Sequence, residues 1–78
     1  MSETILIIED DPSLLMGLTM NLRREGYRVR TANDGHRGLA ELERERPDLV
    51  VLDLNLPGVD GLEILRRIRV DDALLPVV

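Results

Sequence analysis

Residues 49–58 read LVVLDLNLPG, an apolar run that carries a carboxylate at Asp53 before it reaches a turn. A short apolar run that ends in turn residues is typical of a strand buried on both faces, as in a parallel sheet. An ionised carboxylate in such a strand is unfavourable unless it is paired or liganded. The stretch therefore predicts a buried parallel strand whose end lies at a polar site.

Three further segments are predicted strands. Residues 4–8 (TILII) are apolar and β-branched, and residues 27–32 (YRVRTA) alternate strictly, with Arg28 and Arg30 on one face. Residues 74–78 (LLPVV) begin a fourth strand. Because alternation with exposed arginines suits a strand at the rim of a sheet, the second strand is expected at an edge.

Helical signals separate these strands. Asp11 and Pro12 start a helix that ends near Gly26, a second helix runs from about His36 to Arg46, and Asp60 caps a third. The order β-α-β-α-β-α-β predicts an α/β fold with a parallel sheet and helices on both faces. The apolar stripes expected to face the sheet are Leu14, Leu15, Leu18 and Leu22, then Leu39 and Leu42, then Leu62, Leu65 and Ile68.

Acidic residues follow two of the predicted strands. Glu9, Asp10 and Asp11 come directly after residues 4–8, and Asp53 ends the third strand. In a flavodoxin-like, doubly wound sheet of strand order 2-1-3-4, the first and third strands are neighbours, and their carboxyl ends flank the point where ligands bind. The two acidic groups are therefore expected to meet in one crevice.

Several carboxylates in one crevice repel one another, and either protonation or a cation can relieve this. Oxygen ligands without histidine or cysteine favour Mg²⁺, which often binds carboxylates together with a phosphate, so the pattern indicates phosphoryl chemistry. The turn EDDPS after the first strand has no glycine, which excludes a dinucleotide fingerprint and a P-loop. Asp11 could instead be a helix cap, and Glu9 and Asp10 could be strand-end acids that face water.

Composition narrows the class of protein. The chain has 78 residues, no cysteine and a net charge of −5, and all ten basic residues are arginine. These values predict one small domain without disulfides and argue against a nucleic-acid surface. No apolar run approaches the ~20 residues that a membrane span requires. A cytoplasmic domain without membrane contact is expected.

The segments ILIIEDDP and PDLVVLDLNLPGVDGLEILRRIR resemble the receiver domain of two-component response regulators, over Thr4 to Val78. The resemblance implies a signalling domain, not an enzyme for other substrates, in which Asp53 accepts a phosphoryl group from a histidine kinase and later loses it by hydrolysis. It implies that Asp10 and Asp53 bind Mg²⁺ directly and that Glu9 binds it through water. For Asp11 two roles stay open, a helix cap and an acidic residue in the outer shell of the metal site. It also implies a backbone-carbonyl ligand at Asn55 and a matching loop at Pro57, Gly58 and Gly61.

The sequence also departs from this family. A receiver domain has five strands and five helices, and residues 1–78 match strands one to four and helices one to three, so an incomplete receiver domain, (βα)3β, is implied. The family's Thr or Ser after strand four and Lys after strand five are absent from this chain. We therefore expect homo-oligomers of the isolated chain, or a missing C-terminal part.

Two other functions remain open. One is a receiver-like scaffold that oligomerises without phosphotransfer, which the absent Thr and Lys favour. The other is a phosphatase with an aspartate nucleophile, similar to the haloacid dehalogenases. That family uses Asp-x-Asp-x-Thr, whereas this chain has Asp53-Leu54-Asn55 and so lacks the second carboxylate.

Overall fold

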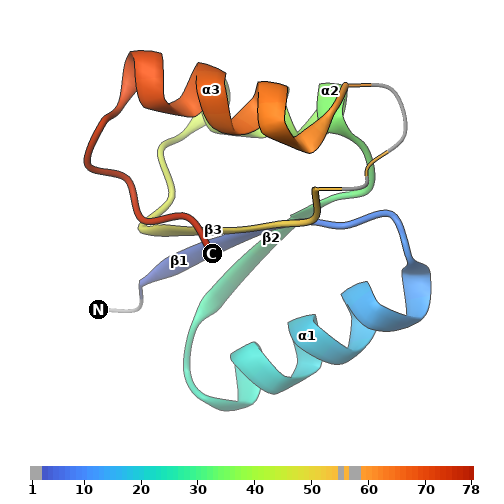
Figure 1. Ribbon diagram of the computed structural model, residues 1–78. Coiled ribbons are helices and arrows are strands. Elements are labelled where there is room, and N and C mark those ends of the chain that lie inside the picture. Colours follow the sequence, from blue (N-terminus) through green and yellow to red (C-terminus); the bar gives the residue numbers. More distant parts are fainter. Residues whose placement is uncertain (1–2, 55, 57–58) are drawn as a thin grey trace.

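The computed structural model describes residues 3–54, 56 and 59–78, which form a three-layered α/β fold (Figure 1). Within these residues three parallel strands make one sheet in the order β2-β1-β3. The order 2-1-3 confirms the predicted flavodoxin-like arrangement and places the arginine-bearing strand at an edge. The elements are β1 (Thr4–Ile8), α1 (Pro12–Arg24), β2 (Arg28–Ala32), α2 (Gly35–Arg44), β3 (Leu49–Leu52) and α3 (Gly61–Asp71).

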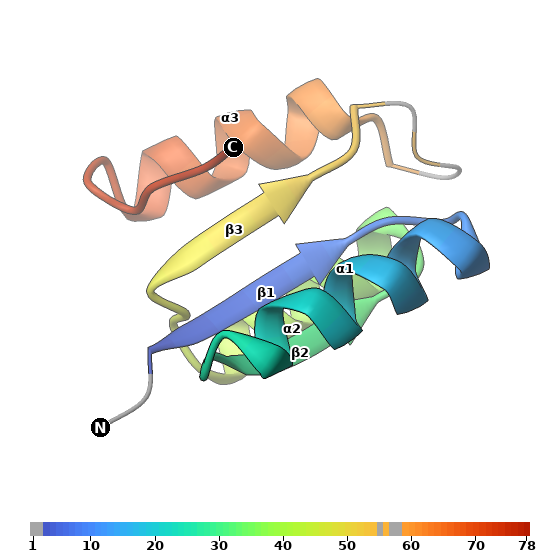
Figure 2. The same ribbon diagram turned by 90° about the horizontal axis from the view of Figure 1, so that it is seen from below.

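Helices cover both faces of the sheet. Helix α1 lies on one face, and α2 and α3 lie together on the other (Figure 1; seen from below in Figure 2). All five residues of β1 are buried between these layers. This central strand supplies Leu6, Ile7 and Ile8 to the core, each with no exposed surface.

The predicted fourth strand is reduced to a bridge. Val77 pairs with Val50 as an isolated parallel bridge outside the named strands. The backbone N–H of Val50 donates to the Pro76 carbonyl at 3.0 Å, and that of Val78 donates to the Val50 carbonyl at 2.9 Å. The segment therefore lies beside β3, where the order 2-1-3-4 placed it. Only its last residues reach the strand, and Pro76 has no N–H to contribute.

The apolar stripe of α3 differs from the predicted one. Ile64 and Ile68 are buried, whereas Leu62 is 57% exposed and Leu65 is half-buried. Spacings of three and four residues both fit a helical face, and the sequence alone allowed the wrong choice. Leu39 and Leu42 of α2 lie half-buried against the core, as expected.

Several element ends shift by one or two residues. Gly26 has a φ of +95° just after α1, which confirms the predicted C-terminal cap. Helix α2 starts at Gly35, before His36, because the Asp34 carboxylate accepts the N–H of Arg37 at 2.8 Å and caps the helix. Strand β2 starts after Tyr27, and β3 ends at Leu52, so that Asp53 lies one residue beyond the strand.

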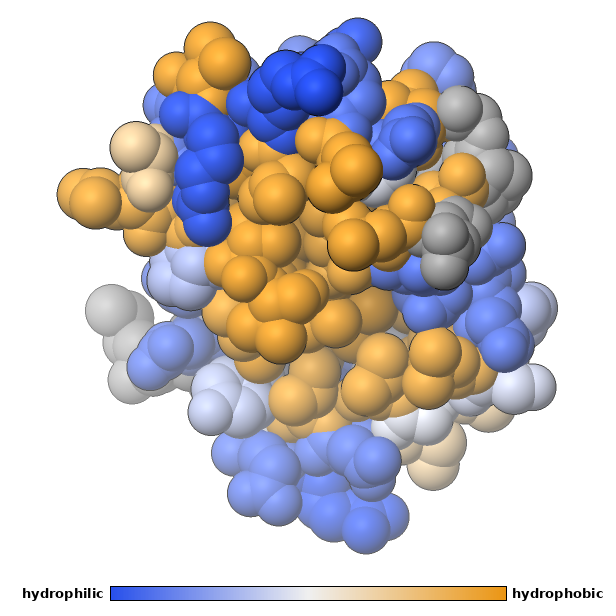
Figure 3. Space-filling model, viewed as in Figure 1, coloured by the Kyte–Doolittle hydropathy of each residue, from blue (hydrophilic) through white to orange (hydrophobic). Residues whose placement is uncertain are grey.

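Helix α1 has no fully buried residue, and its predicted leucine stripe is only partly covered. Leu15, Leu18 and Leu22 are half-buried, and Leu14 is 48% exposed. The methionines beside this stripe, Met16 and Met20, are exposed as well. Figure 3 shows a broad apolar area on the face viewed in Figure 1.

None of the helices in the described part of the chain combines the length and the apolar character needed to cross a membrane.

Candidate functional site

Three acidic side chains meet at the carboxyl ends of two neighbouring strands. Glu9 and Asp10 follow β1, and Asp53 follows β3. One carboxylate oxygen from each of the three lies within 4.8 Å of the others. The two acidic segments, more than forty residues apart in sequence, thus form one cluster, which we call the acidic site.

The sheet itself sets this geometry. Ile8 and Leu52 are register partners at the ends of β1 and β3, so both strands leave the sheet at the same level. The backbone N–H of Asp53 donates to the Ile8 carbonyl at 3.0 Å. On the other side, the N–H of Glu9 donates to the Ala32 carbonyl of β2 at 3.0 Å. Backbone hydrogen bonds therefore hold both acidic segments beside each other before any ligand binds.

Burial differs among the three carboxylates. The sequence singled out Asp53 as the buried acid, but Glu9 is the most buried, with 8% of its surface exposed. Asp53 is half-buried and Asp10 is exposed. Both residues lie one position beyond their strands and donate a backbone N–H to a neighbouring strand, but Glu9 follows the central strand β1, whereas Asp53 follows β3 at the side of the three-stranded sheet.

Burial and the neighbouring carboxylates change the pKa of Glu9. Burial is the main cause that raises its pKa above the usual value, and the side chains of Asp53 and Asp10 raise it further. The backbone N–H of Asp11, which donates to Glu9 Oε2 at 3.1 Å, acts in the opposite direction. A bound cation would relieve the same repulsion and favour the ionised form.

The Asp11 side chain caps α1. Its Oδ1 accepts the backbone N–H groups of Ser13 at 3.0 Å and Leu14 at 3.4 Å. Of the two interpretations left open by the sequence, the structure supports the helix cap. Asp11 contributes its backbone N–H to the acidic site and its carboxylate to the helix.

The backbone of Asp53 and Leu54 lies close to the start of α3. The predicted site residues Asn55, Pro57 and Gly58 lie outside the described residues. Gly61 is described, and a Cβ atom there would lie 2.8 Å from the Asp53 carbonyl oxygen and 2.5 Å from the Leu54 Cα. Because these are backbone atoms, only glycine allows α3 to approach the segment that carries Asp53. The sequence singled out Gly61 only through the family resemblance.

The donor set of the acidic site fits a hard divalent cation. All three side chains offer carboxylate oxygens. Mg²⁺ binds such oxygens, commonly through one or two carboxylates, and keeps several waters. The half-buried Asp53 stays accessible to a ligand that approaches from solvent. The arrangement can therefore place a cation between a carboxylate and an incoming anion such as a phosphoryl group.

Comparison with known proteins gives the family. Residues 5–78 match the family described as "Response regulator receiver domain", and the chain belongs to this family. It is 49% identical over 75 residues to transcriptional regulatory protein AfsQ1 of Streptomyces coelicolor, which covers 96% of this chain and 33% of AfsQ1. It is 41% identical to alkaline phosphatase synthesis transcriptional regulatory protein PhoP of Bacillus subtilis, over 100% of this chain and 32% of PhoP. The chain thus spans about a third of the length of these curated relatives.

Solved structures agree with the fold. Chemotaxis response regulator CheY4 of Vibrio cholerae matches with a TM-score of 0.94 and 28% identity, over 99% of this chain and 66% of that chain. Response regulator TrrA of Thermotoga maritima, solved in complex with Mg²⁺-BeF, matches with a TM-score of 0.87 and 35% identity, over 91% and 62% of the two chains. The CheY-like, flavodoxin-like fold predicted from the sequence is confirmed, and the family is one of signalling domains.

Proposed function

We propose that Asp53 accepts a phosphoryl group from the phosphohistidine of a histidine kinase, with Mg²⁺ bound at the acidic site. The convergence of Glu9, Asp10 and Asp53 within 4.8 Å is the observation that carries this proposal. An acidic crevice repels a phosphoryl group unless a cation is present. Phosphorylation of the acceptor Asp53 therefore requires a metal ion bound in the same crevice.

Each acid has a different role in this proposal. Asp10 and Asp53 would bind Mg²⁺ directly, because their carboxylates are less buried than that of Glu9. Glu9 would act through a water molecule, since its Oε2 already accepts the Asp11 N–H. The backbone carbonyl of Asn55 would supply a further ligand.

The proposed reaction is an in-line displacement at phosphorus. A carboxylate oxygen of Asp53 forms a bond to phosphorus while the P–N bond to the kinase histidine breaks, and that imidazole keeps the electron pair. The product is an acyl phosphate. When bound, Mg²⁺ offsets the charge that the carboxylate and the phosphoryl oxygens bring together. Later, water attacks phosphorus, inorganic phosphate leaves, and the Asp53 carboxylate is restored. The domain phosphorylates and dephosphorylates itself and turns over no other substrate.

The names of the relatives suggest the kind of protein in which such a segment works. AfsQ1 and PhoP are named transcriptional regulatory proteins, and this chain matches about a third of each. We infer that the matching segment receives the signal in the cytoplasm. With a net charge of −5, it would leave contact with nucleic acid to other parts of a regulator.

Chemical phosphorylation tests the proposal. Incubation of the chain with acetyl phosphate and Mg²⁺ is expected to give one hydroxylamine-labile phosphoryl group per chain, detected by intact-mass spectrometry. Asp53→Asn should abolish the label. Asp60→Asn is the matched control, because asparagine also caps a helix and Asp60 serves as the cap of α3. Continuous hydrolysis of a phosphomonoester would instead indicate a phosphatase. A folded chain that takes up no label would contradict the proposal. The remaining interpretation would then be a receiver-like scaffold without phosphotransfer.

We also propose that the isolated 78-residue chain self-associates. Leu74 is 87% exposed and Val78 is 77% exposed, and the leucine stripe of α1 is itself only half-buried. In the described part of the chain, no strand pairs with the outer edge of the segment that contacts β3. Open edges and exposed apolar surface favour pairing between copies. Light scattering after size exclusion is expected to give a mass above that of one chain, and a stable monomer at high concentration would contradict this.

A further inference from the structure

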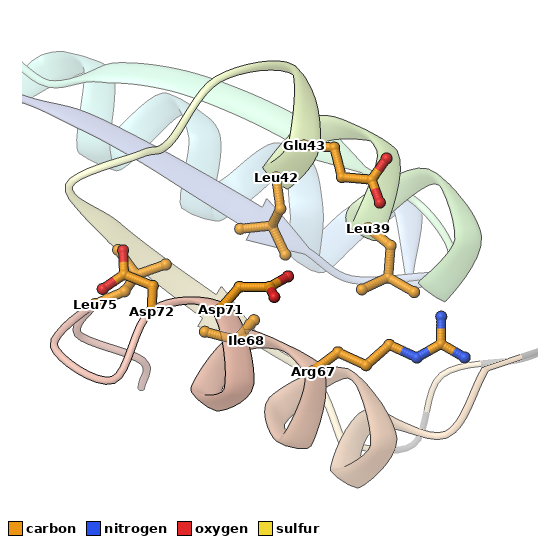
Figure 4. A pocket seen from close by; sticks show the side chains of 8 residues that line it. All are labelled: Leu39, Leu42, Glu43, Arg67, Ile68, Asp71, Asp72 and Leu75. Carbon is orange, nitrogen blue, oxygen red and sulfur yellow. The ribbon is translucent and has the colours of Figure 1, made fainter.

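A pocket of about 140 Å³ lies between α2 and α3, and no residue of the acidic site lines it (Figure 4). Leu39 and Leu42 of α2 and Ile68 of α3 point into it, and Leu75 closes its other end. An apolar cavity of about 150 Å³ holds one benzene-sized molecule, whereas drug-sized ligands occupy about 300 Å³ or more. The pocket therefore has room for one apolar side chain.

Arginine contacts hold the pocket in shape. Arg46, just after α2, forms an ion pair with Asp72 at the end of α3, which ties the two helices together. Arg69 donates from Nη1 to the Leu75 carbonyl at 2.5 Å and so holds the segment that carries Leu75. A binding site held by such contacts loses little entropy when it is occupied.

The rim of the pocket is acidic. Glu43 and Asp71 are exposed on its two sides, and neither forms an ion pair with another described residue. The one cation on the described rim is Arg67, whose Nε lies 3.6 Å from Glu63 Oε1, and Glu63 is shared with Arg66 at 2.7 Å. Two carboxylates without an ion pair therefore flank an apolar pocket beside a single arginine, and this net negative rim attracts a positively charged partner with an apolar side chain.

We propose that this pocket is a docking site for a protein segment that inserts one aliphatic side chain between two basic residues. The aliphatic group contacts the leucines and Ile68, and the flanking arginines or lysines pair with Glu43 and Asp71. An anchor side chain in a preformed pocket with a charged rim is a common design of peptide sites. This contact is separate from phosphorylation of Asp53.

A titration of ¹⁵N-labelled chain with the peptide Ac-Arg-Leu-Arg-NH2 tests the proposal. Amide shifts are expected at Leu39, Leu42 and Ile68, with a dissociation constant on the order of 1 mM. The peptides Ac-Arg-Gly-Arg-NH2 and Ac-Glu-Leu-Glu-NH2 should bind more weakly, because the first lacks the apolar anchor and the second has the wrong charge.

Charge reversal sharpens the test. The double variant with Glu43→Arg and Asp71→Arg should bind Ac-Arg-Leu-Arg-NH2 about 2- to 25-fold more weakly, since an exposed ion pair contributes a factor of about 1.4 to 5. The same variant should bind Ac-Glu-Leu-Glu-NH2 better than the unchanged chain does. Glu25→Arg, at the end of α1 on the opposite face of the sheet, is the control and should change neither affinity.

Three results would overturn the proposal. One is the absence of shifts at the pocket up to 10 mM peptide, a concentration about ten times the expected dissociation constant. Another is equal binding of all three peptides. The third is a set of pocket shifts that depends on protein concentration without peptide, because the occupant would then be a second copy of the chain.

Discussion

The glycine at the start of α3 gives a quantitative test of how the structure builds the acidic site. In Gly61→Ala the new methyl group would lie 2.5 Å from the Leu54 Cα and 2.8 Å from the Asp53 carbonyl oxygen. Ordinary contacts of a Cβ atom begin at 3.4 Å, so α3 and the segment after β3 must separate by about 0.9 Å. No side-chain rotation can relieve this clash, because both neighbours are backbone atoms.

The expected cost follows from this displacement. Overpacking of a well-filled region typically costs about 1–3 kcal/mol, and alanine at the first helical position recovers part of it. In a domain of this size each kcal/mol lowers the unfolding midpoint by about 4–8 °C. The displaced segment carries Asp53, so the variant should also bind Mg²⁺ more weakly than the unchanged chain.

Thermal unfolding followed by circular dichroism, with and without Mg²⁺, measures both effects. Gly17→Ala is the matched control. Nothing lies within 4 Å of a Cβ atom at Gly17, in the middle of α1, so alanine should raise stability by up to about 1 kcal/mol through helix propensity. If Gly61→Ala unfolded at the same temperature as the unchanged chain and bound Mg²⁺ equally well, the close approach would be refuted.

Three further predictions use other parts of the fold. Ile64→Ala should lower the free energy of unfolding by about 2–5 kcal/mol, whereas Leu62→Ala should change it by less than about 0.5 kcal/mol; urea titration of both variants tests the register of α3. Hydrogen bonds from Arg44 and Arg30 lower the pKa of Glu41 below its usual value of 4.5. The ionised Glu41 therefore contributes to the free energy of unfolding above pH 4.5, and this contribution is lost as the pH falls through the lowered pKa. Glu41→Gln should therefore destabilise the chain at pH 7 and have no effect at the lowest pH, as measured by unfolding across pH. At a free Mg²⁺ concentration 100 times its dissociation constant, stability should rise by about 2.7 kcal/mol in the unchanged chain and less in Asp10→Asn, as calorimetry can measure.

The acidic site shows how far local pattern can reach. The alternation of strands and helices, together with the rule that ligands bind where the strand order reverses, was enough to bring Asp10 and Asp53 together. Neither step needs knowledge of side-chain packing, because parallel strands must leave the sheet at the same edge. The same pattern did not assign the Asp11 carboxylate, which could serve a helix or a metal until its hydrogen bonds to α1 were known.

Packing decided what periodicity left open. Leu62 and Ile64 are equally apolar, and only the position of α3 over the sheet buries one and exposes the other. The pocket between α2 and α3 has no signal in the sequence, because its lining comes from two helices and from Leu75, which follows α3. Likewise, the sequence shows Gly61 only as the residue after the helix cap. The need for glycine there follows from the Leu54 backbone that lies beside it in the structure.

The sequence by itself determined the order of the elements, the parallel sheet and the two acidic segments. These depend on the period of apolar residues and on caps, which are local properties of the chain. Only the tertiary structure decided that Glu9 is the most buried acid of the site and that residues 74–78 form a bridge in place of a strand. Burial and pairing depend on atoms that distant segments bring close, and no local pattern records their positions.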